Sequence, residues 1–201
     1  MKQTERRAVQ TPANTFHLPE SYGEIERIDL LENRRQLLLV NGLAVLIAAV
    51  MILPPLIVRG LHFREDGIGL ILLKIVILLT AAVVYMALHE LVHGVFIRKY
   101  SGRRPGYGVG MGYACAGSDA YFNKKSYIII ALSPVIIWGV ALLILNLALS
   151  SAWFWVVYGV QITNISGAAG DYYVTYRMLK MPSDILVRDS GTKMAVYAPK
   201  Q

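Results

Sequence analysis

Long apolar runs, separated by short polar and basic segments, make up most of this 201-residue chain. An α-helix needs about 20 apolar residues to cross the hydrocarbon core of a bilayer, and four runs reach that length. Pro54-Pro55 should break or end the helix of the first run near its far side. The pattern therefore predicts an all-α membrane protein with four transmembrane helices. The runs cover residues 36–58, 68–96, 126–149 and 153–178.

Polar segments flank this predicted membrane domain, which we place at residues 36–180. The N-terminal segment, 1–35, mixes acidic and basic residues with scattered apolar residues from Leu18 onwards. Such a mixture is typical of either an interfacial segment or a solvated linker. In the C-terminal segment, 181–201, two short strand-like stretches surround Ser190-Gly191 and predict a small hairpin.

The composition supports membrane insertion. Hydrophobic residues form 55% of the chain and charged residues 16%, and the mean hydropathy of +0.47 is too high for an ordinary soluble domain. The net charge of +7 comes from basic residues in the segments between the apolar runs, so membrane topology explains it better than a nucleic-acid partner. We expect a multi-pass protein of the cell membrane with both termini cytoplasmic. The oligomeric state stays open.

A glycine-rich stretch follows the second apolar run. From Tyr107 to Cys115, glycine or alanine alternates with a larger residue, and this period of two suits an extended strand or hairpin. One interpretation is an edge strand that pairs with an extended substrate, and the other is a flexible connector. Cys115 is the only cysteine, so no intrachain disulfide can form.

The second apolar run carries an H-E-x-x-H pattern, formed by His89, Glu90 and His93. Residues four apart on a helix lie on the same face one turn apart, so both histidines can reach one metal ion, and Zn²⁺ suits that geometry. Glu90 is rotated by about 100° from His89, where it can contact a metal-bound water without binding the metal. The alternative is a chance pattern of polar residues that neighbouring groups satisfy.

A catalytic zinc usually has three protein ligands, and elimination points to Asp171 as the third. Glu90 and Asp171 are the only carboxylates inside apolar runs, where an unpaired charge is costly. Asp171 lies about 27 Å beyond Trp153 and His89 about 31 Å beyond Ile68, so antiparallel helices place them at nearly the same depth.

Other residues are candidates for weaker roles. Asn164 shares a helix face with Asp171 and is either a hydrogen-bond donor beside the site or a polar helix-packing contact. Cys115 and Asp119 in the glycine-rich loop are minor ligand candidates. The alternative role for Asp171 is that of a structural partner of Arg177 or of a tyrosine hydroxyl.

The constellation resembles the site-2 protease class of intramembrane metalloproteases, through the H-E-x-x-H, the glycine-rich loop and an N-x-x-G-x-x-x-D that ends at Asp171. More closely, the chain from Leu18 onwards resembles a family of small bacterial proteins described as putative zincin peptidases, a domain of unknown function. This resemblance implies that His89 and His93 bind zinc, Glu90 activates water and Asp171 completes the site. The segments that carry it are 18–29, 87–94 and 187–192.

The predicted function is that of a membrane zinc metallopeptidase, in which a zinc-activated water hydrolyses peptide bonds of membrane or membrane-associated substrates. One alternative is a non-catalytic metal-binding membrane protein, such as a pseudoprotease that acts as an adaptor. A metal or proton carrier is a third, because His and Asp in membrane helices also build ion pathways. A carrier needs polar residues across the outer half of the spans, where only Lys74 is charged.

Overall fold

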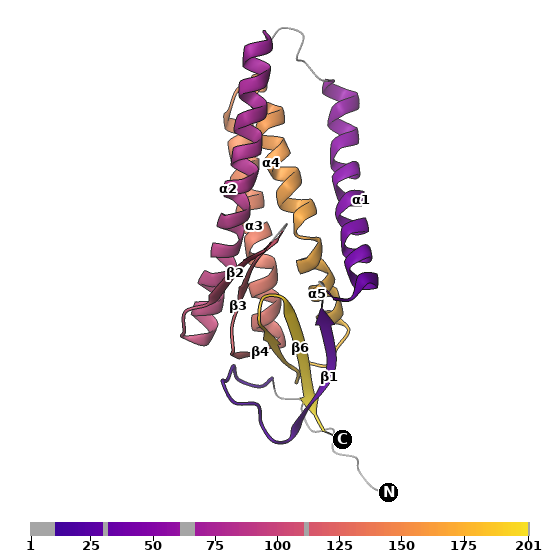
Figure 1. Cartoon of the computed structure of the whole chain (residues 1–201), viewed down its shortest axis with the longest axis vertical. Coiled ribbons are helices and arrows are strands. Elements are labelled where there is room, and N and C mark those ends of the chain that lie inside the picture. Colours follow the sequence, from indigo (N-terminus) through magenta and orange to yellow (C-terminus); the bar gives the residue numbers. More distant parts are fainter. Residues whose placement is uncertain (1–10, 30–31, 61–66, 111–112, 201) are drawn as a thin grey trace, which may run out of the picture.

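The computed structural model describes residues 11–29, 32–60, 67–110 and 113–200, so the first ten residues of the predicted N-terminal tail lie outside it. Helices align side by side at one end of the molecule, and a β-sheet lies at the other end (Figure 1). The helices are α1 (Arg34–Arg59), α2 (Ile68–Ser101), α3 (Lys124–Ala148), α4 (Phe154–Gly167) and α5 (Ala169–Leu179), with a 3₁₀ turn, η1 (Ser151–Trp153), before α4.

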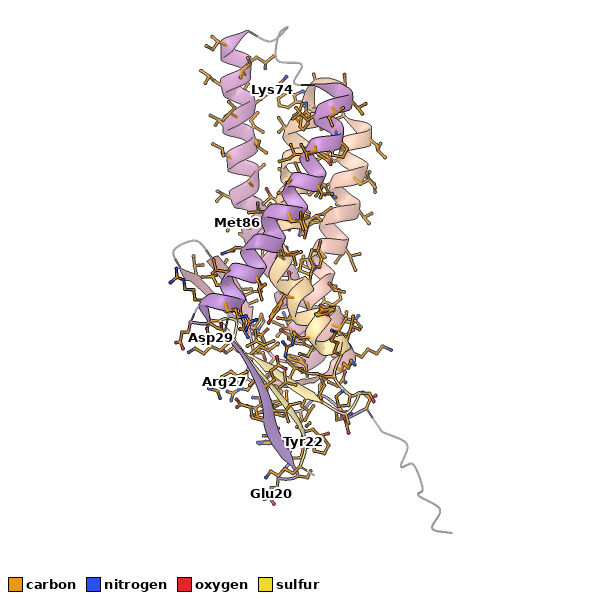
Figure 2. All side chains as sticks on the ribbon, turned by 90° about the vertical axis from the view of Figure 1, so that its right-hand side faces the viewer. Glu20, Tyr22, Arg27, Asp29, Lys74 and Met86 are labelled. Carbon is orange, nitrogen blue, oxygen red and sulfur yellow. The ribbon has the colours of Figure 1, made fainter. Side chains whose placement is uncertain are left out.

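Three of the described helices, α1, α2 and α3, are long and apolar enough to cross a membrane, which indicates a membrane protein. Their surfaces expose many large apolar side chains, as lipid-facing helices do. The fourth predicted span is divided between α4 and α5 at Ala168 and forms no single long helix. Lys74 lies near the far end of α2, opposite the sheet that carries Tyr22 and Arg27 (Figure 2).

The prediction that Pro54-Pro55 breaks or ends the first helix is wrong, because α1 continues to Arg59. Proline at position 55 has no N–H to donate to the carbonyl of Met51, four residues earlier. The hydroxyl of Tyr158 in α4 donates to that carbonyl at 2.8 Å. A side chain from the neighbouring helix thus satisfies the backbone group that the proline leaves without its helical partner.

The prediction of an all-α protein holds only in part: the described chain is mostly helical, but four strands form an antiparallel sheet in the order β1-β6-β5-β4. Strand β1 lies in the segment that we expected to be interfacial or a linker, and β5 and β6 lie in the expected C-terminal hairpin. The two chain segments therefore meet in one sheet. The strands are β1 (Tyr22–Asp29), β4 (Tyr121–Asn123), β5 (Leu186–Asp189) and β6 (Lys193–Pro199).

Burial of apolar side chains fixes the sheet against α5 and the adjacent ends of α2 and α3. Ile28 of β1, Phe122 of β4, Val187 of β5 and Val196 of β6 are each at most 2% exposed and belong to one core that includes Met178 of α5. Burying side chains of this size contributes about 1.5–3 kcal/mol each. The sheet therefore holds α5, and with it Asp171, against the rest of the molecule.

The glycine-rich stretch forms a separate two-stranded antiparallel hairpin of β2 (Gly106–Gly110) and β3 (Tyr113–Gly117). Strand β3 leads towards the turn between β5 and β6, where the Ser118 N–H donates to the carbonyl of Asp189 at 2.7 Å. The hairpin lies beside α2 at the level of the site described next (Figure 1).

Candidate metal centre

Three potential metal ligands converge where α2 meets α5. His89 Nε2 lies 3.3 Å from Asp171 Oδ2, and His93 Nε2 lies 3.5 Å from Asp171 Oδ1. One ligand atom from each residue can be chosen so that all three lie within 4.8 Å of one another. The three residues predicted as ligands are thus brought together. Asp171 lies in the first turn of α5, where the partial positive charge of a helix N-terminus stabilises a carboxylate.

The ring of His89 is oriented by a buried hydrogen-bonded chain. Asn164 Nδ2 donates to the carbonyl of Val135 at 3.2 Å, which turns Asn164 Oδ1 towards Tyr85. The Tyr85 hydroxyl donates its proton to that oxygen at 2.7 Å. The same hydroxyl lies 2.7 Å from His89 Nδ1 and must accept a hydrogen bond there. His89 therefore carries its ring proton on Nδ1 and turns the lone pair of Nε2 towards Asp171.

His93 is oriented in the same sense by the backbone of α3. Its Nδ1 lies 2.9 Å from the carbonyl oxygen of Ile130, and a carbonyl can only accept. His93 therefore also places its proton on Nδ1 and its Nε2 lone pair towards Asp171. A ring nitrogen held by an outer hydrogen bond, with the other nitrogen directed inward, is the usual arrangement of a metal-binding histidine.

The converging atoms fit a divalent metal ion. Two ring lone pairs facing a carboxylate repel it unless positive charge lies between them, and a metal ion can serve all three groups at once. Zinc binds His nitrogen at about 2.0–2.1 Å and carboxylate oxygen at about 2.0–2.2 Å, so tetrahedral ligand atoms lie about 3.3 Å apart. The two His–Asp separations, 3.3 Å to Oδ2 and 3.5 Å to Oδ1, are close to that spacing, and one ligand atom from each of the three residues lies within 4.8 Å of the others.

A cavity of about 440 Å³ opens beside these residues, and Glu90 lies in its wall. Ala116 in β3 lines the same cavity as Glu90. Ala114 and Cys115 of the same strand line the cavity too. Strand β3 of the glycine-rich hairpin therefore forms one wall of this cavity.

Asp189, at the end of β5, also lines the cavity and has no role in the sequence-based prediction. Its Oδ2 accepts a hydrogen bond from the Tyr127 hydroxyl at 2.5 Å, and its Oδ1 accepts one from the Gly191 N–H at 2.8 Å. Burial raises the pKa of the Asp189 carboxyl above its usual value, and these two donors partly oppose the rise.

The structure separates the remaining predicted residues from the ligand cluster. Asp119 is exposed and pairs with Arg188 at 2.6 Å, and Cys115 lines the cavity but is not part of the cluster. Arg177 pairs with Glu26 of β1 and not with Asp171. Asn164 is fully buried, but it faces Tyr85 and Val135, so the expectation of a donor directly beside the metal site is replaced by an indirect contact through Tyr85.

Sequence reasoning missed Tyr85, which links Asn164 to His89. A signal was present, because Tyr85, His89 and His93 are spaced by four residues and share one helix face. Ile130 acts through its backbone carbonyl, so its side chain gave no indication of this contact with His93.

Together these features define a largely helical protein with a candidate metal centre between α2, which is long and apolar enough to cross a membrane, and α5. The chain belongs to the family described as "putative zincin peptidase", whose model matches residues 82–186 and so includes every residue of the cluster. That description implies zinc as the metal. No curated protein and no solved structure matches the chain significantly.

Proposed function

We propose that this protein is a membrane-embedded zinc metallopeptidase that hydrolyses peptide bonds of membrane or membrane-associated substrates. The observation that carries the proposal is the convergence of His89, His93 and Asp171 beside Glu90 in one cavity. When bound, zinc supplies a Lewis acid that acidifies water and polarises a carbonyl group.

The chain's own residues supply the rest of the chemistry. His89 and His93, fixed by Tyr85 and the Ile130 carbonyl, hold the ion together with Asp171. Glu90, from its place in the cavity wall, takes a proton from the attacking water and passes it to the leaving amine. Strand β3 pairs with β2, and its residues 114–116 line the cavity, which supports the proposal that an extended substrate aligns along β3.

The proposed topology has four crossings, with α4 and α5 together making the fourth. Pairing of β1 with β6 supports it, because the segment before α1 and the segment after α5 must then lie on the same side. Basic residues in the segments on that side, such as Arg98, Lys99 and Lys180, favour the cytoplasmic face of the cell membrane.

The test combines metal analysis with a cleavage assay. The purified full chain in lipid nanodiscs should contain about one zinc per chain, and His93→Ala and Asp171→Ala should lose it. The wild type should cleave members of a membrane-peptide library, detected by mass spectrometry, while Glu90→Gln keeps its zinc and cleaves none. A wild type without zinc would contradict the metal centre. Zinc without cleavage of any library member would favour a non-catalytic adaptor.

A further inference from the structure

Both hydrogen-bonded chains that orient the two histidines end on one short segment of α3. His93 contacts the carbonyl of Ile130 directly, and His89 reaches the carbonyl of Val135 through Tyr85 and Asn164. Pro134 lies inside this segment, in the middle of a membrane-spanning helix, and is almost completely buried. The location of a proline between the two carbonyls requires a physical explanation.

In a regular α-helix the carbonyl of Ile130 would accept the N–H of residue 134, four positions later. Pro134 has no N–H, so this carbonyl loses its helical partner. Two side chains take its place: His93 Nδ1 at 2.9 Å and the Ser133 hydroxyl at 3.0 Å. A carbonyl oxygen has two lone pairs, and these donors use both. An ordinary residue at 134 would add a third donor and compete with His93.

We propose that Pro134 is a positioning residue of the metal centre, because it releases the Ile130 carbonyl to hold His93 with its proton on Nδ1. Helix α3 orients both histidines. The carbonyl of Val135, next to Pro134, accepts from Asn164, which reaches His89 through Tyr85. The inference rests on the proposed metal centre. It attributes the orientation of His93 to a carbonyl of α3 that lacks its helical N–H donor.

The first experiment measures zinc affinity of the full chain in nanodiscs by competition with a chelator of known affinity. Pro134→Ala restores the N–H and should weaken zinc binding about 10–100-fold, the usual cost of losing an outer partner of a metal-binding histidine. Pro54→Ala is the matched control, because it also restores an N–H within a membrane helix, but in α1, away from the cluster. It should leave the affinity unchanged.

A second variant separates the missing N–H from the proline ring. Incorporating the α-hydroxy analogue of alanine at position 134 replaces the amide by an ester, which has no N–H. This ester variant should bind zinc more tightly than Pro134→Ala, close to the wild type. Equal affinity of the ester and Pro134→Ala, or a Pro134→Ala affinity within twofold of the wild type, would overturn the proposal.

A measurement on the wild type does not depend on whether any variant folds. Nitrogen-15 NMR of metal-free protein with labelled histidine should show neutral His93 protonated on Nδ1. Protonation on Nε2 would overturn the inference even if all variants misfold. A wild type that binds no zinc would instead contradict the proposed function, so the two failures are distinguishable.

Discussion

The hydroxyl of Tyr85 lies 2.7 Å from both His89 Nδ1 and Asn164 Oδ1, one helical turn before the first candidate ligand. Tyr85→Phe keeps the ring and its packing but removes both hydrogen bonds. We expect zinc affinity to fall about 10–100-fold, as measured by chelator competition. Tyr158→Phe is the matched control: it removes the hydrogen bond to Met51 that joins α4 to α1, and should leave zinc affinity unchanged. An unchanged zinc affinity in Tyr85→Phe would show that the hydrogen bonds of Tyr85 do not orient His89.

The contact between the β2–β3 hairpin and the turn that joins β5 to β6 can be tested at Gly117, which faces this turn. A Cβ there would lie 2.3 Å from the backbone carbon of Ser190 and 2.6 Å from the nitrogen of Gly191. Backbone atoms of a turn that joins two paired strands cannot move aside cheaply, so Gly117→Ala should destabilise the protein by about 1–3 kcal/mol. Unfolding in a graded denaturing detergent measures the loss.

Gly106 is the control for that substitution, since it is the register partner of Gly117 in the same hairpin. Its Cβ would meet nothing closer than the Gly117 carbonyl oxygen at 3.9 Å. Gly106→Ala should therefore retain wild-type stability. Equal losses in the two variants would mean that hairpin flexibility, and not contact with the turn, explains the effect.

Metal removal should lower the stability of the folded chain. A ligand that binds only the native state stabilises it by about 2.7 kcal/mol at a free concentration of 100 times its Kd. Chelation should therefore lower the melting temperature in nanodiscs, and added zinc should restore it. His93→Ala lacks one of the clustered side chains and should show neither response. A zinc-dependent rise of the same size in that variant would place the stabilising ion elsewhere.

Stability should also depend on pH through Asp189. Because burial raises the pKa of this carboxyl, the native state keeps its proton at pH values where the unfolded chain has lost it. The free energy of unfolding therefore decreases as pH rises from the ordinary pKa of about 3.9 to the raised value. Asp189→Asn should remove this decrease, measured by denaturation at a series of pH values.

A substitution at Tyr127 gives a second test of this pH dependence. The Tyr127 hydroxyl donates to Asp189 and opposes the rise in the pKa of the Asp189 carboxyl. Tyr127→Phe should extend the pH range over which stability decreases towards higher pH. If Asp189→Asn retains the wild-type pH dependence, another group is responsible for it.

Local patterns predicted the helices that carry the site well. The apolar runs gave α2 and α3 to within five residues at each end, because a membrane-length helix is recognisable from composition alone. The spacing of His89 and His93, and the cost of Asp171 in an apolar run, predicted the three residues that meet in the structure. Their role as ligands stays a prediction.

The sheet could not be predicted in the same way. In β1, Ile28 is buried but Ile25 is 53% exposed, so its apolar residues do not line one face, and a register shift between Glu24 and Glu26 interrupts the alternation. Its partner β6 lies at the other end of the chain, and such pairing has no local signal. The break between α4 and α5 was hidden for a different reason, since the apolar run continues through it.

The order of strands also determines when the sheet can be completed during synthesis. Strand β6 lies between β1 and β5, although β1 is made before the helices and β6 after them. A nascent chain that ends after α5 already contains His89, His93 and Asp171, but it lacks the strand that joins β1 to β5 and closes the sheet. The cavity wall at Asp189 is thus secured last, and a growing chain should acquire its finished site only after β6 has emerged from the ribosome.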